Sequence, residues 1–101
     1  MKDRRVRFTA TAEQHFENER AWWRKNRDNH EVFEIVLEQT LVRIAAHPHS
    51  APLCRRPIVK GLRRSYVPKI ACHLYYTADE RTVTVRALWG ARRRRGPLVV
   101  Q

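Results

Sequence analysis

The chain has 101 residues, 43% hydrophobic and 31% charged, which predicts one folded domain over residues 1–101 and excludes a disordered chain. The formal net charge is +11, and it is uneven: residues 51–101 hold twelve Lys and Arg against two Asp and Glu, whereas residues 1–50 hold nine against eight. So basic a second half predicts a polyanionic or acidic protein partner, and the absence of any run of roughly 20 apolar residues excludes a membrane span.

The chain opens with a predicted strand and a predicted helix. Over residues 4–9, apolar side chains alternate with arginines, which is the period of a half-buried strand. Thr11, followed three residues later by Gln14, has the pattern of a capping box, in which side chains satisfy the first free amides of a helix. We therefore expect a helix over about residues 12–26.

A second helix is predicted over residues 31–46. Its apolar residues recur with i, i+3, i+4, i+7 spacing, and its glutamates face away from them. Pro48 ends this helix because proline cannot continue the hydrogen-bonding pattern. The polar link between the two helices is short, so we expect an antiparallel helical hairpin.

The second half changes to a period of two residues. This alternation predicts three strands over residues 62–67, 70–77 and 83–89, the last two joined by a short polar hairpin connection. The fold class is therefore α+β in the order β-α-α-β-β-β, with the helical hairpin packed on one face of a small, mainly antiparallel sheet.

The end of the last strand raises a separate question. Alternation places Trp89 on the same face as Val83 and Val85, which favours a core position for the indole over a contact surface. Gly90 is expected to let the backbone turn after the strand. Residues 92–95 are four consecutive arginines, which form either a solvated charge run or part of a functional site.

Metal and cofactor sites are not expected. His47, His49 and Cys54 are possible zinc ligands, but a fourth ligand has no evident position and the spacing matches no zinc-finger pattern. No glycine-rich phosphate loop is present. The basic first residues do not lead into the apolar region of a signal peptide, so we expect a soluble, cytoplasmic protein in which Cys54 and Cys72 stay reduced.

The order of these motifs resembles the RelE/ParE toxins of bacterial type II toxin–antitoxin modules. The segments that carry the resemblance are "VRFTATA", "WWRKN", "LVRIAAHP", "GLRRSYVP", "HLYYTADERTVTVRALW" and "GARRRRGP". The resemblance implies a growth inhibitor that a cognate antitoxin neutralises and that serves plasmid stabilization. One departure is that many members carry a histidine shortly before the final arginine, where this chain has Gly90 and Ala91. This departure leaves open whether the toxin is active.

The target divides the family. The RelE-like branch cleaves mRNA in the ribosome, whereas the ParE-like branch poisons DNA gyrase. RNA cleavage requires proton transfer and cations beside the phosphate. On the RelE-like reading the candidate catalytic residues are Lys60, Arg63, Arg64, His73, Tyr76 and Arg92. No Tyr or His follows Trp89, where nuclease members often use a tyrosine, so the sequence favours the ParE-like branch.

On the ParE-like reading, exposed arginines contact the target. The candidate target-binding residues are Arg63, Arg64, Arg86, Arg92 and Arg93. Arg92 is expected to project beside Arg86, with Arg94 and Arg95 as supporting charge. For Arg86, ordinary solvent exposure and a place in the site are equally open.

Two other classes of protein fit the same residues. One is a basic nucleic-acid-binding module without toxicity, whose affinity would depend steeply on salt. The other is a toxin fold that has lost its activity. For the toxin, the expected partner is an acidic amphipathic antitoxin segment that lies over the basic sheet or beside the helical hairpin.

Overall fold

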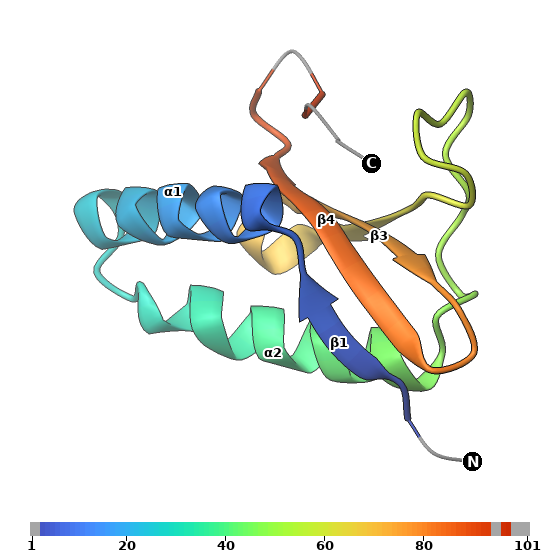
Figure 1. Ribbon diagram of the computed structural model, residues 1–101. Coiled ribbons are helices and arrows are strands. Elements are labelled where there is room, and N and C mark those ends of the chain that lie inside the picture. Colours follow the sequence, from blue (N-terminus) through green and yellow to red (C-terminus); the bar gives the residue numbers. More distant parts are fainter. Residues whose placement is uncertain (1–2, 94–95, 98–101) are drawn as a thin grey trace.

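The computed structural model describes residues 3–93 and 96–97, which form a layer of two helices on one face of a four-stranded sheet (Figure 1). The elements are β1 (Arg5–Phe8), α1 (Ala10–Asn26), α2 (Glu31–Ala46), β2 (Arg63–Val67), the 3₁₀ helix η1 (Pro68–Ile70), β3 (Cys72–Ala78) and β4 (Thr82–Gly90). The strand order is β1-β4-β3-β2; β1 runs parallel to β4, and the other neighbours are antiparallel. The predicted fold class and element order are confirmed.

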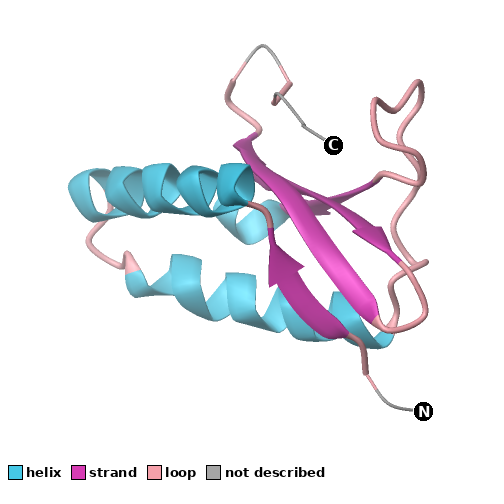
Figure 2. Ribbon diagram, in the orientation of Figure 1, coloured by secondary structure: helices cyan, strands magenta, loops and turns pink. Residues whose placement is uncertain are grey.

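The two helices form the predicted antiparallel hairpin (Figure 2). Phe33 and Ile44 of α2 are fully buried and belong to the same hydrophobic cluster as Phe16 and Trp23 of α1. On the surface, Arg20 of α1 pairs with Glu34 of α2. Neither helix in the described part of the chain is long and apolar enough to cross a bilayer.

Helix α1 begins two residues earlier than predicted. Its N-cap is Thr9, whose hydroxyl accepts a hydrogen bond from the Ala12 amide at 3.1 Å. The Thr9 amide in turn donates to the carbonyl of Val85, which fixes the turn between β1 and α1 against the sheet. The capping box at Thr11 and Gln14 was therefore wrong: the same chemistry operates at an earlier threonine.

The strand predicted to begin at residue 70 begins at Cys72 instead. Pro68 starts the 3₁₀ helix, in which Ile70 is buried, and Ala71 takes a left-handed conformation with φ of 50° before β3. Proline has no amide proton and a fixed φ, so it favours this tight turn over continued pairing.

A β-bulge interrupts the pairing of β3 with β4. Tyr75 pairs with Ala87 and the next residue, Tyr76, pairs with Val85, so Arg86 is an extra residue in β4. An extra residue in one strand shifts its alternation by one position and turns all later side chains to the opposite face.

The bulge explains why the predicted side of Trp89 was wrong. Before the bulge, Val83 and Val85 pack in the helix-facing core. After the bulge, the residue of β4 that faces this core is Leu88, which is 1% exposed. Ala87 and Trp89 lie on the other face of the sheet, in a smaller hydrophobic cluster. The indole of Trp89 is only partly buried there.

Candidate target-binding face

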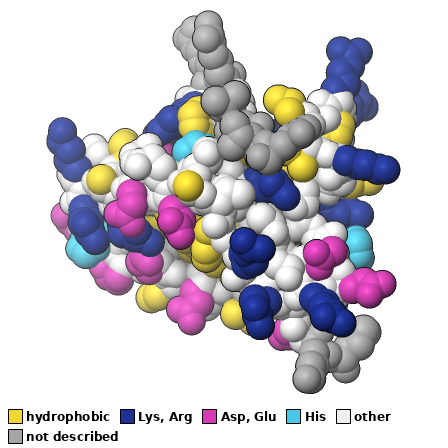
Figure 3. Space-filling view, viewed as in Figure 1, with side chains coloured by type: hydrophobic (Ala, Val, Ile, Leu, Met, Phe, Trp, Pro, Cys, Tyr) yellow, Lys and Arg dark blue, Asp and Glu magenta, His cyan; other side chains and the backbone are white. Residues whose placement is uncertain are grey.

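The sheet face turned away from the helices gathers aromatic and basic side chains, and we call it the outer sheet face. Two rows of register partners across β2, β3 and β4 form it: Tyr66, His73 and Trp89, and Arg64, Tyr75 and Ala87. The loop that precedes β2 covers part of this face through Leu62, Cys54 and Val59. In the view of Figure 3, most acidic side chains lie over the helices, whereas Lys and Arg side chains gather over the strands and loops.

Two groups of rings lie at the outer sheet face. The ring of His73 lies 5.0 Å from that of Tyr66 and 6.4 Å from that of Tyr75, between centroids. On β4, the ring of Trp89 lies 5.1 Å from that of His15 of α1, between centroids, and the guanidinium carbon of Arg93 lies 4.2 Å from the centroid of the indole. Such a surface can bind planar groups by stacking and anions by charge.

His73 has an unusual environment on this face. Burial, and then the positive charge of Arg64, lower the pKa of its imidazole, so the ring is neutral at neutral pH. Its Nδ1 atom is buried and has no hydrogen-bond partner among the described residues. Because Nδ1 is shielded, a proton from a bound group could pass only to the other ring nitrogen, Nε2.

His73 also lines a cleft of about 440 Å³ with Arg43, Arg64 and Tyr66. No Asp or Glu occurs between Glu38 and Asp79 in the sequence, and no carboxylate pairs with either arginine in the described structure. Two guanidinium groups without an acidic partner attract anions.

Two predicted site residues do not lie on the outer sheet face. Tyr76 is fully buried in the helix-facing core, and its hydroxyl donates to the Pro48 carbonyl at 2.6 Å. Its register partner Arg63 donates to the Ala51 carbonyl at 2.6 Å and holds the loop before β2 in place. In this structure both side chains are engaged in structural contacts.

Two further predicted residues stand apart from both groups of rings. Lys60 is exposed on the loop before β2. Arg86, the bulge residue, is half-buried, and its Nε donates to the Thr77 hydroxyl at 2.9 Å. Arg94 and Arg95, the supporting charges, lie outside the described residues.

Arg92 turns back toward α1 and does not project beside Arg86. Its guanidinium pairs with the carboxylate of Glu19, with 3.2 Å between Nη2 and Oε2, and its Cζ lies 4.2 Å from the centroid of the Trp22 ring. The Glu19 side chain is only 2% exposed, and Arg93 approaches the same carboxylate at 3.7 Å. Glu19 was not predicted as a site residue, although it lies on the buried helix face formed by Phe16 and Trp23.

Gly90 makes room for this ion pair. An ideal Cβ built on Gly90 would lie 2.6 Å from Nη1 of Arg92, too close for any side chain without movement of the guanidinium. Gly90 is the last residue of β4 and has no positive φ. The expected turn does begin at Gly90, where the Arg93 amide donates to the Gly90 carbonyl at 3.1 Å, but without a positive φ it does not need the conformational freedom of glycine.

Comparison with known proteins identifies the fold. No family model matches this sequence, and no curated protein matches it. Among solved structures, a chain described as "Chromosomal ParDE TA system from P. aeruginosa" superposes with a TM-score of 0.69 over 88% of this chain and 97% of that one, at 9% sequence identity. The chain has the fold of this ParDE chain.

On this ParDE-type fold, the outer sheet face combines stacking rings, unpaired guanidinium groups and one neutral imidazole. No cluster of three metal-ligating side chains occurs in the part of the chain that the structure describes, and His47, His49 and Cys54 form none. The chemistry that these side chains can supply is therefore recognition of a polyanion or a planar group, and proton transfer at His73.

Proposed function

We propose that this protein is the toxin of a type II toxin–antitoxin module, a cytoplasmic growth inhibitor that a cognate antitoxin neutralises. The observation that carries the proposal is the fold shared with the ParDE chain over nearly the whole length of both chains. The ordered motifs of the sequence, from "VRFTATA" to "GARRRRGP", support the same assignment.

The proposed target is DNA gyrase, as for ParE-like toxins. A gyrase poison acts by binding and needs no proton-transfer set, and the outer sheet face is rich in binding groups: Arg64, Tyr66, Trp89 and Arg93. Among the candidate proton-transfer groups, Tyr76 is buried and residues 90–101 contain neither Tyr nor His. On this reading the protein is not an enzyme.

A second candidate function is ribosome-dependent cleavage of mRNA, as for RelE-like toxins. The observation that favours it is the neutral imidazole of His73 beside Arg64 and Tyr66 on one open face. His73 would take the proton from the attacking 2′-hydroxyl, and Arg64 would stabilise the charge that develops on the phosphate.

Expression in a bacterial host tests the toxin assignment. We expect induction of this chain to stop growth, and co-expression of a cognate antitoxin to restore growth. Normal growth despite accumulation of folded protein, shown by circular dichroism of the purified chain, would contradict the proposal.

The target is tested with purified protein. We expect inhibition of gyrase supercoiling or trapping of cleaved DNA, and no cuts in mRNA on translating ribosomes. Arg64→Ala should weaken the effect on gyrase at least about tenfold because it removes a desolvated cationic contact. Arg81→Ala, at the distant β3–β4 turn, is the matched control and should have no effect. Codon-positioned cuts that His73→Ala abolishes would instead establish the RelE-like function.

A further inference from the structure

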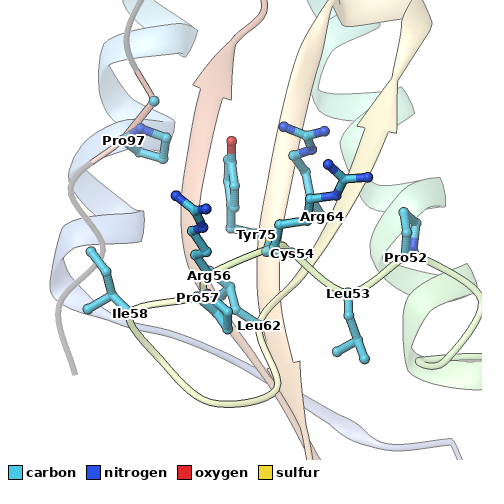
Figure 4. A pocket seen from close by; sticks show the side chains of 12 residues that line it. Pro52, Leu53, Cys54, Arg56, Pro57, Ile58, Leu62, Arg64, Tyr75 and Pro97 are labelled. Carbon is cyan, nitrogen blue, oxygen red and sulfur yellow. The ribbon is translucent and has the colours of Figure 1, made fainter.

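A second recess lies where the loop before β2 approaches the sheet, and we call it the loop pocket. It has a volume of about 610 Å³ (Figure 4). Leu62 and Tyr75, both nearly buried, contribute to its lining, and so do the exposed aliphatic side chains of Leu53 and Ile58. Leu53 is 58% exposed and Ile58 63%, which are high values for large apolar side chains in a small domain.

All charged side chains that line the loop pocket are basic. Arg55, Arg56 and Arg64 line it, and among the described residues none of the three pairs with a carboxylate. In Figure 4 the guanidinium groups of Arg56 and Arg64 point to the same side as the hydroxyl of Tyr75. An apolar recess is thus bordered by cations that have no acidic partner.

Internal hydrogen bonds hold the loop that forms one wall of the loop pocket. The Cys54 amide donates to the Leu62 carbonyl at 2.9 Å, and the Leu62 amide donates to the Val59 carbonyl at 3.2 Å, so the loop is closed on itself. Within it Arg56 adopts a φ of +49°, the left-handed region that costs energy for any residue with a Cβ. Arg56 thus lines the loop pocket at some cost in backbone strain.

We propose that the loop pocket docks an acidic peptide segment whose bulky apolar side chain enters between Leu53 and Ile58 while its carboxylates pair with Arg55, Arg56 and Arg64. This combination joins apolar burial to charge complementarity. A nucleic acid would satisfy the arginines but would leave the aliphatic walls without a matching group. The assignment of this segment to the antitoxin rests on the proposed function. Bound in the loop pocket, the antitoxin segment would cover Arg64 and so block the outer sheet face.

A synthetic peptide tests the docking without any assumption about toxicity. The probe alternates glutamate with leucine over ten residues, and a control peptide replaces every glutamate by glutamine. Alkylation of Cys54 by iodoacetamide, followed by mass spectrometry, reports occupancy because Cys54 lines the loop pocket and is only partly buried. Cys72 is fully buried and serves as the internal reference.

We expect the acidic peptide to slow alkylation of Cys54 about tenfold at roughly ten times its Kd, since only the free fraction reacts. The glutamine peptide should protect Cys54 from alkylation far less than the acidic peptide does. Arg56→Gly should abolish protection while the melting temperature stays equal or rises, because glycine relieves the left-handed strain. Arg55→Glu should also abolish protection, and Arg81→Glu, an identical charge change outside the pocket, should preserve it.

Two results would overturn the docking proposal. The first is that the acidic peptide protects Cys54 in Arg56→Gly and Arg55→Glu as well as it does in the wild-type chain. The second is that a single-stranded RNA oligonucleotide of equal charge protects Cys54 better than the peptide does. Failure of the proposed function gives a different result. If expression leaves growth normal while the acidic peptide protects Cys54 in an arginine-dependent way, the docking site stands and its assignment to an antitoxin falls.

Discussion

Leu88→Ala is expected to lower the free energy of unfolding by about 3 kcal/mol, whereas Trp89→Ala should lower it by only about 1 kcal/mol. The larger side chain has the smaller effect because of the bulge at Arg86. Leu88 faces the helices and is 1% exposed, and its removal leaves a cavity in the main core. Trp89 lies half-buried on the outer sheet face, where water can fill the space it leaves.

Urea unfolding followed by far-ultraviolet circular dichroism measures both values. Trp89→Ala should remain folded yet lose growth arrest, because it removes one ring of the outer sheet face and the support of Arg93. Val83→Ala, before the bulge and fully buried, is the control that should resemble Leu88→Ala. If Trp89→Ala proved the more destabilising of the neighbouring pair, β4 would have no bulge and the indole would face the core.

The sequence predicts the helices and strands, but it does not predict the bulge in β4. Helix α2 was predicted over its full length because the apolar side chains that form its periodic stripe are the ones that bury against the sheet. The strand content of residues 63–90 followed in the same way from alternation. A bulge leaves the composition of β4 unchanged, so only the pairing with β3 reveals that the faces exchange at Arg86.

Some residues of the candidate site could be predicted from the sequence and others could not. Arg64 and His73 were predicted and lie within one face, because strand alternation and antiparallel pairing bring them there. Arg63 was chosen for its charge, which carries no information about the carbonyl groups that its side chain meets. The loop pocket could not be predicted from the sequence, because Leu53 and Ile58 lie in a segment without periodicity, where burial cannot be inferred.

Arg92→Ala is expected to destabilise the fold by about 2 kcal/mol, although arginines near a chain end usually contribute little. The reason is Glu19: its carboxylate is buried, and without Arg92 only Arg93, at 3.7 Å, remains to pair with it. Loss of the stacking contact with Trp22 adds to the cost. This expected loss of stability is smaller than the loss from breaking a fully buried ion pair, because the Arg92 side chain is 38% exposed.

Arg93→Ala is the matched comparison, with the same change one residue later. It should cost less than about 1 kcal/mol, because Arg92 keeps its closer contact with Glu19. The two variants should then separate stability from toxicity. Arg93→Ala should lose growth arrest while folded, since this guanidinium stands over Trp89 on the outer sheet face, whereas Arg92→Ala should lose it only in proportion to unfolding.

A second substitution, at Glu19, tests whether the unpaired carboxylate causes the loss of stability in Arg92→Ala. In the Arg92→Ala background, Glu19→Gln should recover part of the lost stability, because a neutral amide is less costly to bury than an unpaired carboxylate. In the wild-type background the same change should be destabilising, because it removes the charge that Arg92 and Arg93 neutralise. A double-mutant cycle in urea measures this coupling. Strictly additive effects would show that Arg92 stabilises the fold through Trp22 alone, and that the buried carboxylate does not depend on it.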